Sequence, residues 1–246
     1  VVSTDEPFLR LVNQGMILGE NGVKMSKSLG NVINPDDIIS EFGADSMRVY
    51  EMFMGPLQQE KPWSTQGLVG VHRFLDRVWR LTERSIIDEA PDEELQRTLH
   101  KTIKKVGEDT NKLAFNTAIS QMMILVNEIY KRDAVPKEVW EALIRMLAPY
   151  APHLAEELWE MQGNEEPVSL ASWPGFREEL TKDDQTEIVL QVNGKIRSRM
   201  TVAAGTDRES LQAEAMRDER IAELTAGKEV VKVIAVPDKL VNVVVK

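Results

Sequence analysis

Between residues 62 and 162, apolar side chains recur every three or four positions, which is the period of an amphipathic α-helix. Five such stretches are separated by short connections and begin near prolines or residues that cap helices well. The five expected helices run from Ser64 to about Ile86, Pro91 to about Asn111, Phe115 to Lys131, Pro136 to near Pro149, and Pro152 to Met161. Short connections between amphipathic helices predict an antiparallel bundle, so we expect a mostly α protein.

After a proline- and glycine-containing linker at 163–184, the pattern changes to short strand-like runs. Two strands are expected at 187–192 and 195–202, and two more near 229–236 and 240–245. Between them, Thr206 and Asp218 are expected to cap two helices. The order β-β-α-α-β-β predicts a small α+β domain after the bundle.

The first hairpin of that domain can form in two registers. A two-residue turn at Asn193-Gly194 would mix apolar and charged side chains on one face. A three-residue turn, with Leu190 opposite Ile196 and Ile188 opposite Ser198, would separate the faces, and we expect this register.

The expected register places Lys195, Arg197 and Arg199 together on the outer face of the hairpin. Such a basic stripe suits contact with RNA phosphates. The alternative is a stripe that serves only solubility.

A second basic stripe lies on the first expected helix. It comprises Arg73, Arg77, Arg80 and Arg84, whose spacings of 4, 3 and 4 keep them on one side of a helix. This stripe suits phosphate contact, and the alternative is a solvated face paired with Asp76 and Glu83. A looser stripe on the second helix, for which a solvated face is favoured, comprises Arg97, Lys101, Lys104, Lys105 and Lys112.

Near the start of the chain, residues 24–28 form a loop whose composition suits a polyphosphate. The string is Lys-Met-Ser-Lys-Ser, and Gly22 and Gly30 flank it. Two ammonium groups and two hydroxyls can bind phosphate oxygens and stabilise charge that develops on a leaving group. Composition alone would also fit an ordinary surface loop. After the loop, one helix is expected between Asn34 and Gly43, and a second, capped by Asp45, is expected to end at Phe53.

Several strings, in order along the chain, carry a resemblance to one family. The lysine-serine loop resembles the second signature of class I aminoacyl-tRNA synthetases, and its surroundings resemble the leucyl enzymes of the bacterial type. The supporting strings lie at 14–18, 31–37, 43–45, 50–56 and 61–64. Strings at 147–153 and 156–159 resemble the helix junction of class I anticodon-binding domains, and those at 191–195 and 236–242 resemble the C-terminal domain of bacterial leucyl enzymes.

The resemblance implies an enzyme that activates leucine with ATP and transfers it to tRNA. It implies catalytic roles for Lys24 and Lys27, and ATP contacts from Lys24, Met25, Ser26, Lys27, Ser28 and Asn31. It also implies that leucine tRNA is a partner, and that Mg²⁺ accompanies ATP but is held mainly outside this chain.

The family's other ATP signature, His-x-Gly-His, is missing. The chain begins at Val1, and none of His72, His100 and His153 lies in such a string. His153, at a proline corner, is expected to cap or pack. We therefore expect the C-terminal portion of the enzyme, inactive without the upstream catalytic and editing portion. Its expected divisions are the end of the catalytic region at 1–61, a helical tRNA-binding region with its linker at 62–178, and an α+β tRNA-binding domain at 185–246.

Composition narrows the alternatives. The net charge is −10, but residues 179–246 carry 11 basic and 12 acidic side chains, so local RNA contact is compatible with the charge. Without cysteine there is no thiolate zinc site, which argues against some isoleucyl enzymes, and three scattered histidines suggest no other metal site.

No run is long enough for a membrane span, and we expect a cytoplasmic protein. The remaining alternatives are a valyl or isoleucyl enzyme and a free-standing RNA-binding or scaffold module.

Overall fold

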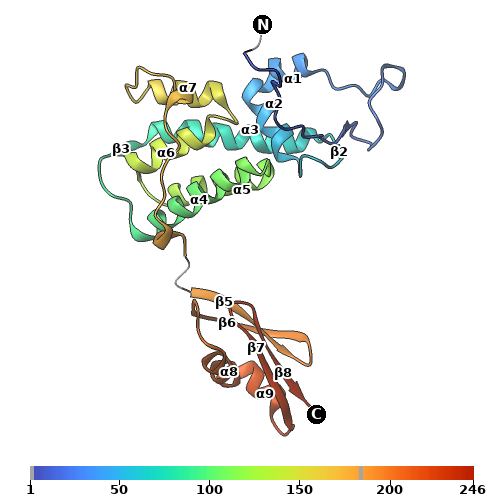
Figure 1. The fold of residues 1–246 in the computed structure, drawn as a ribbon, viewed down its shortest axis with the longest axis vertical. Helices are drawn as coiled ribbons and strands as arrows, with labels where there is room; N and C mark the ends of the chain where they lie inside the picture. Colours follow the sequence, from blue (N-terminus) through green and yellow to red (C-terminus); the bar gives the residue numbers. More distant parts are fainter. Residues whose placement is uncertain (1–2, 183–184) are drawn as a thin grey trace. The chain divides into compact units, whose positions relative to one another are not determined.

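The computed structural model describes residues 3–182 and 185–246, and the chain divides into two compact units between Thr181 and Lys182 (Figure 1). About half of the chain is helical, with small sheets. The last two residues of the expected linker, Asp183 and Asp184, lie outside the described residues, as does Val1. Each unit is described by itself.

The first unit begins with the lysine-serine loop and two helices. Its elements are β1 (Ile17–Leu18), the short 3-10 helix η1 (Lys27–Leu29), α1 (Pro35–Phe42), α2 (Ala44–Phe53) and β2 (Lys61–Pro62). Strands β1 and β2 pair in parallel, and Asn34 caps α1 by accepting a hydrogen bond from the Asp36 backbone N–H.

The longer helices follow. They are α3 (Thr65–Arg80), α4 (Glu93–Asn111), α5 (Phe115–Ile129), α6 (Lys137–Leu147) and α7 (Pro152–Glu160). The shorter elements between and after them are η2 (Leu81–Glu83), β3 (Ser85–Ile87), β4 (Ala134–Pro136), η3 (Val168–Leu170) and η4 (Glu178–Thr181). Ser64 and Asp92 cap α3 and α4 as their side chains predict.

The expected helix from Ser64 to Ile86 is too long by about two turns. Helix α3 ends at Arg80, the chain tightens into η2, and Arg84 has extended backbone angles. Residues Ser85–Ile87 instead form β3, which pairs with β4. The β-branched residues Ile86 and Ile87 suit a strand, and the partner strand lies about fifty residues away in the sequence.

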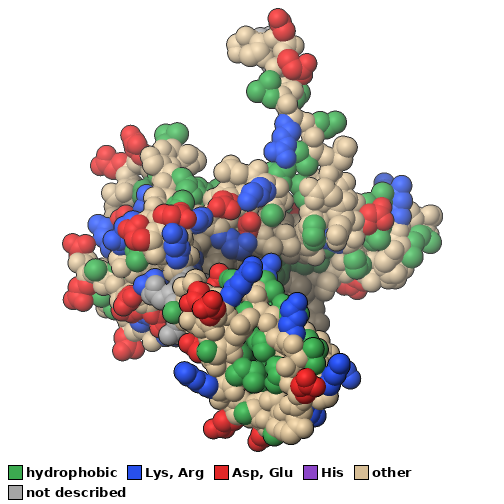
Figure 2. Space-filling model, turned by 60° about the horizontal axis from the view of Figure 1, so that its bottom comes forward, with side chains coloured by type: hydrophobic (Ala, Val, Ile, Leu, Met, Phe, Trp, Pro, Cys, Tyr) green, Lys and Arg blue, Asp and Glu red, His purple; other side chains and the backbone are tan. Residues whose placement is uncertain are grey.

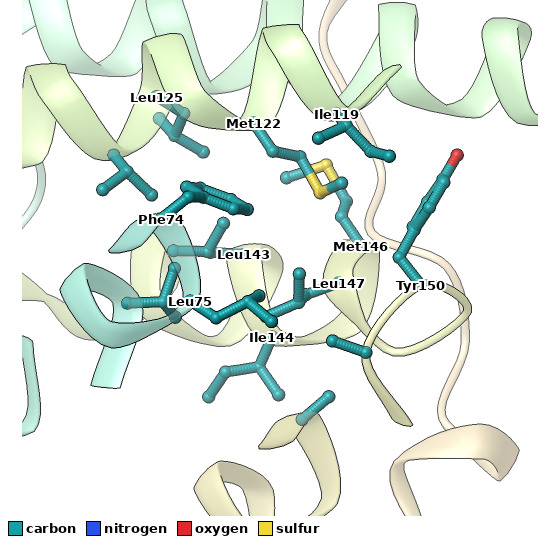
Figure 3. Close-up of a cluster of buried hydrophobic side chains, with 14 of the residues drawn as sticks. Phe74, Leu75, Ile119, Met122, Leu125, Leu143, Ile144, Met146, Leu147 and Tyr150 are labelled. Atoms are coloured by element: carbon teal, nitrogen blue, oxygen red, sulfur yellow. The ribbon is translucent and has the colours of Figure 1, made fainter. Parts of the chain in front are cut away.

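One hydrophobic core holds the first unit together. Figure 3 shows side chains from three helices pointing toward one another: Phe74 of α3, Met122 of α5 and Leu143 of α6 meet with their neighbours. Tyr50 of α2 and the adjacent Trp63 belong to the same core, and their rings meet edge to face with centroids 4.9 Å apart. The segment that carries the lysine-serine loop therefore shares its core with the helices after it.

A buried carboxylate also joins the loop segment to these helices. Asp45, near the start of α2, is 9 % exposed. One of its oxygens accepts a hydrogen bond from the Leu154 backbone N–H at 2.7 Å, and the other lies 2.8 Å from His153 Nδ1. Helix α7 has no capping side chain next to it in sequence, so Asp45 supplies the cap from another helix. One helical turn later, Arg48 donates a hydrogen bond to the Pro149 carbonyl at 3.1 Å.

The expectation that Asp45 caps its own helix is therefore wrong. Gly43 is the N-cap of α2 and provides no side-chain hydrogen bond. The expectation that His153 caps or packs stays a prediction, because its side chain is 75 % exposed and its Nδ1 lies 2.8 Å from the Asp45 carboxylate that caps α7.

The second unit is a four-stranded sheet with two helices. Its elements, in chain order, are β5 (Gln185–Val192), β6 (Lys195–Ala203), α8 (Arg208–Arg217), α9 (Glu219–Thr225), β7 (Val230–Val236) and β8 (Leu240–Val245). The strand order is β6-β5-β8-β7, with β5 and β8 parallel and the other pairs antiparallel. Helices α8 and α9 lie on one side of the sheet and bury Leu211 and Ile221 against its apolar residues.

The hairpin between β5 and β6 differs from the expected register. Val192 pairs directly with Lys195, and Asn193 and Gly194, with φ of 50° and 76°, form the two-residue turn. A β-bulge then shifts the register, so that Leu190 pairs with Ser198. The expected pairs of Leu190 with Ile196 and of Ile188 with Ser198 are therefore wrong.

The bulge is the physical reason for this difference. One extra residue in β6 allows the tight turn and still keeps Ile188, Leu190 and Val192 on the buried face. The Asn193 side chain also bonds the Val245 backbone N–H and carbonyl, which fixes the turn to β8.

Of the two expected helix caps in this unit, one is confirmed and the other lies one residue later in the sequence. Asp218 caps α9 as expected. Asp207, rather than Thr206, caps α8, and the Thr206 hydroxyl donates instead to the Ala203 carbonyl in the preceding turn.

The cap of α4 predicts an acid-sensitive contribution to stability. The Arg132 guanidinium, together with the Leu95 backbone N–H, holds the pKa of Asp92 well below its usual value of 3.8. A carboxyl whose pKa is lowered by folding stabilises the fold above its unfolded pKa, and this stabilisation is lost as pH falls through the native pKa. Asp92→Asn keeps a capping oxygen but loses the charge. We expect the wild type to be more stable than this variant at pH 7, and the difference to shrink below about pH 4.

Urea midpoints measured from pH 7 to pH 2.5 check this expectation. The chain has five tryptophans, all before residue 181, so their fluorescence reports on the first unit. Asp88→Asn, at an exposed position, is the matched control and should follow the wild type. A difference for Asp92→Asn that stays constant across this range would contradict the assignment.

The contacts of Asp45 with the start of α7 predict a larger change in the stability of the first unit, which should be seen at pH 7. Asp45→Ala leaves the first N–H groups of α7 without a cap and should destabilise the first unit by about 1.5–3 kcal/mol. The urea midpoint, followed by tryptophan fluorescence, measures it. Asp88→Ala should change the midpoint little, and a loss for Asp45→Ala below about 0.5 kcal/mol would mean that the joint is dispensable.

Candidate phosphate-binding loop and cationic surfaces

The lysine-serine loop is held in shape by three of its own polar residues. Ser26 caps η1 by accepting from the Leu29 backbone N–H, and its hydroxyl lies 3.1 Å from that of Ser28. Asn31 closes the loop, because its side-chain oxygen accepts from the Ser26 backbone N–H at 2.9 Å and its amide faces the Lys24 carbonyl at 3.4 Å. Gly30 ends η1 in the left-handed region, with φ of 63°.

The side chains of the two lysines of the loop are exposed to solvent. Across the described residues, neither the Lys24 nor the Lys27 ammonium has an ion-pair or hydrogen-bond partner. Met25, in contrast, is half-buried and packs against the core of the first unit. The loop thus combines an anchored frame, formed by Met25, Ser26 and Asn31, with two free cations and the exposed Ser28 hydroxyl. ATP contacts from the six sequence-predicted residues stay a prediction.

The arginine stripe of the sequence divides into two pairs. Arg77 and Arg84 both stack on the ring of Tyr130, with each guanidinium carbon 4.5 Å from the ring centroid. Arg77 also donates to the Asn127 side-chain oxygen at 2.7 Å, and Arg84 donates to the Arg132 carbonyl. These two arginines hold α3 and the following turn against α5, which is a structural use of cation–π contact.

The other two arginines remain on the solvent side of α3. Arg80 forms an exposed ion pair with Asp76 at 3.0 Å, as the solvated-face alternative expects. Arg73 is exposed and has no partner in the portion of the chain that the structure describes. Of the stripe, Arg73 and Arg80 are therefore the members that remain exposed on α3, and only Arg80 of these two has an ion-pair partner among the described residues. Sequence spacing could not separate the pairs, because Tyr130 lies at the C-terminal end of another helix, α5.

The looser stripe on α4 is a surface of ion pairs. Arg97 pairs with Glu93 at 3.1 Å, Lys105 with Asp109 at 2.8 Å, and Lys112 with Glu108 at 3.1 Å, each one helical turn apart. Lys104 pairs with Glu178 of η4 at 2.6 Å. This arrangement supports the solvated-face interpretation of the stripe.

In the second unit the basic hairpin residues do not share one face. Lys195 pairs with Val192, on the side that carries the buried residues, whereas Arg199 pairs with Val189 on the opposite side and makes an ion pair with Glu187 at 2.7 Å. The bulge places Arg197 between them. Lys195 and Arg197 are exposed, and within residues 185–246 their side chains have no ion-pair or hydrogen-bond partner. Figure 2 shows Lys and Arg side chains around an apolar area on this unit.

A hollow that sequence reasoning missed lies beside α2. It has a volume of about 560 Å³ and is lined by residues from four separate segments, among them Met16, Glu51, Lys61 and Phe115. Burial raises the pKa of Glu51, and burial lowers the pKa of Lys61, whose ammonium donates to the Gly55 carbonyl at 3.1 Å. No single motif could have signalled it, because the segments meet only in the fold.

Two further searches concern the described residues alone. They contain no group of three or more His, Asp or Glu side chains that could hold a metal ion. None of their helices combines the length and apolar character that crossing a membrane requires.

The chain is similar to known proteins over nearly its whole length. The chain is similar over 100 % of its length to a leucine–tRNA ligase of Chloroherpeton thalassium, at 54 % identity over 253 aligned residues, which are 31 % of that protein. It is also similar to the crystal structure of the ternary complex of Agrobacterium radiobacter K84 LeuRS with tRNA and LeuAMS. The TM-score is 0.75 at 32 % identity, and the match covers 99 % of this chain and 34 % of that one. The chain thus spans about a third of the length of these relatives.

Two family models match as well. The model for class I tRNA synthetases (I, L, M and V) matches residues 1–64, which include the lysine-serine loop. The model for the anticodon-binding domain of tRNA ligase matches residues 92–214, half of the chain. From the loop, the helical unit and these matches together, we conclude that the chain belongs to the class I tRNA synthetases and carries their anticodon-binding domain.

Proposed function

We propose that this chain is the C-terminal portion of a leucine–tRNA ligase, which activates leucine with ATP and transfers it to leucine tRNA. The single observation that carries the proposal is the lysine-serine loop. It presents two partnerless ammonium groups on an anchored frame, within the segment that matches the class I synthetases. The likeness to leucine enzymes over the whole chain supports leucine as the amino acid.

In the proposed reaction, Lys27 and Lys24 stabilise the pyrophosphate that leaves when leucine attacks ATP. Fixed positive charges placed where negative charge develops lower the barrier without transferring a proton. Ser28 donates a hydrogen bond to the same phosphates, and Ser26, Met25 and Asn31 keep the loop in shape. The loop offers cations and hydroxyls, which do not fit a metal ion, so the Mg²⁺ that accompanies ATP is held by phosphate oxygens and by the upstream portion.

The upstream catalytic and editing portion of the enzyme is the proposed partner that completes the active site. Apolar side chains around the loop support this proposal, because Val23, Leu29 and Val32 are 46 %, 61 % and 49 % exposed. Such exposure of neighbouring apolar groups is typical of a surface that another portion of the protein covers.

The remaining divisions are proposed to bind tRNA. We assign the end of the catalytic region to 1–61, an antiparallel helical bundle to 62–178, and a ββααββ domain to 185–246. On the bundle, Arg73 and Arg80 are the proposed phosphate contacts, while Arg77 and Arg84 position α3. In the last domain, Lys195 and Arg197 are the stronger candidates, because Arg199 already pairs with Glu187.

The loop proposal predicts a large loss of activity for Lys27→Ala in the full-length enzyme. Leucine-dependent pyrophosphate exchange should fall by about 100- to 1,000-fold, while leucine binding should change little, because the lost interaction forms mainly in the transition state. Lys112→Ala, at the exposed residue that ends α4, is the matched control and should leave exchange unchanged. A fall of less than about threefold would make Lys27 an ordinary surface lysine. The 246-residue chain alone should show no exchange, and measurable exchange would contradict a divided active site.

The hairpin proposal predicts a weaker salt dependence of tRNA binding. Each phosphate contact contributes about 0.7 to 0.9 to the slope of log affinity against log salt, depending on whether the RNA is single-stranded or duplex. Lys195→Gln with Arg197→Gln should therefore reduce the slope of the full-length enzyme by about 1.4 to 1.8, similarly for different tRNA sequences. Arg199→Gln should reduce it less, because that guanidinium is already ion-paired. A double variant with the wild-type slope would leave the hairpin as a solvated surface.

A further inference from the structure

The base of the lysine-serine loop is tied to the start of helix α3 through one exposed carboxylate. Glu20 follows β1 and comes four residues before Lys24. Its Oε1 accepts a hydrogen bond from the Thr65 hydroxyl at 2.8 Å and lies 3.4 Å from the Thr65 backbone N–H. Thr65 is the first residue of α3, so the contact joins positions that are 45 residues apart in sequence.

Thr65 is itself fixed by buried groups. Its hydroxyl oxygen accepts a hydrogen bond from Trp63 Nε1 at 3.2 Å, so the hydroxyl proton remains available for Glu20. Trp63 is 4 % exposed and packs edge to face on Tyr50, whose hydroxyl accepts from the Ser64 backbone N–H at 2.6 Å. Glu20 therefore binds a group that cannot easily move, and a carboxylate is favoured at this positive end of a helix.

Burial raises the pKa of the Tyr50 hydroxyl, and the negative charge of Glu20 acts in the same direction. The geometry is consistent with this effect, since Tyr50 and Glu20 bond to the adjacent residues Ser64 and Thr65 at the start of α3.

Glu20 lies in a tight turn between β1 and the lysine-serine loop. The chain turns back on itself here, because the Gly22 N–H donates to the Gly19 carbonyl and the Gly19 N–H donates to the Val23 carbonyl, both at 2.8 Å. Before this turn, β1 is fixed by its pairing with β2. After it, the chain enters the loop with the two free lysines. Within this turn, the Glu20 side chain contacts the start of α3 through Thr65.

We propose that Glu20 is a positioning residue that holds the base of the lysine-serine loop against the start of α3, so that Lys24 and Lys27 reach the phosphates in one geometry. The proposal rests on the proposed function of the loop. A misplacement of about 1 Å in a positioned catalytic group can cost on the order of 100-fold in rate, so a single tether is enough to matter. Glu20 itself touches no substrate in this scheme.

The test compares variants of the full-length enzyme in leucine-dependent pyrophosphate exchange. Glu20→Ala and Thr65→Val should each lower kcat by about tenfold, with the KM for leucine unchanged. Because both remove the hydrogen bond between Glu20 and the Thr65 hydroxyl, the double variant should lose little more than Thr65→Val alone, which also removes the acceptor of the Trp63 Nε1–H. Two conservative variants should recover most of the activity: Glu20→Gln keeps an acceptor oxygen at the same reach, and Thr65→Ser keeps the hydroxyl. Glu89→Gln, at an exposed carboxylate in the same unit, is the matched control.

A purely structural role for Glu20 gives a different result. It would lower the thermal midpoint and leave kcat within about twofold of the wild type, and that outcome would overturn the proposal. Losses that multiply in the double variant would overturn it as well. Lys27→Ala separates this inference from the function it rests on. If Lys27→Ala abolishes exchange and Glu20→Ala does not slow it, the loop keeps its proposed role and only the tether is wrong. If Lys27→Ala has no effect, the proposed function itself fails.

Discussion

Helix α7 begins at a proline corner that offers its first N–H groups no local side chain, and Asp45 satisfies them from another helix. This tertiary cap joins the loop segment and the helices into a single body. It acts together with the shared core around Tyr50 and Trp63 and with the Arg48 contact to the Pro149 carbonyl. A buried carboxylate with several donors is costly to remove, because the donors would then lose their partner in a place that water reaches poorly. The position of α2, which follows the loop in the chain, therefore depends on this cap together with the shared core and the Arg48 contact.

The local features of this fold follow well from the sequence, and the tertiary features follow poorly. Caps at Asn34, Ser64, Asp92 and Asp218 come from side chains that bond their own helix, so they could be predicted from neighbours in sequence. Asp45 could not, because its partner N–H groups are more than a hundred residues away. The signal that points to it is indirect, since Ala151-Pro152 opens a helix without a capping residue.

The candidate site shows the same division. The loop could be found because its lysines and serines are contiguous, and Asn31 lies close enough to be included with them. The spacing of the arginine stripe identified four basic residues but not their contacts, because Arg77 and Arg84 stack on Tyr130, which is distant in sequence. In the hairpin, alternation of apolar and charged residues favoured a three-residue turn, but a bulge can restore the buried face with a shorter turn. Such a bulge adds one residue to a strand, so the alternation of apolar and polar residues along the sequence does not predict it.

The bulges of the second unit have a consequence for the protein's behaviour at high concentration. The strand order β6-β5-β8-β7 leaves β6 and β7 as edges, and each edge strand carries a register shift, near Arg197 in β6 and near Val231 in β7. An open edge presents unpaired backbone groups that can recruit a strand from another molecule, and a local bulge or a charged side chain interrupts that template. The bulges that make the hairpin differ from its expected register therefore also oppose association of this sheet with edge strands of other copies of the protein.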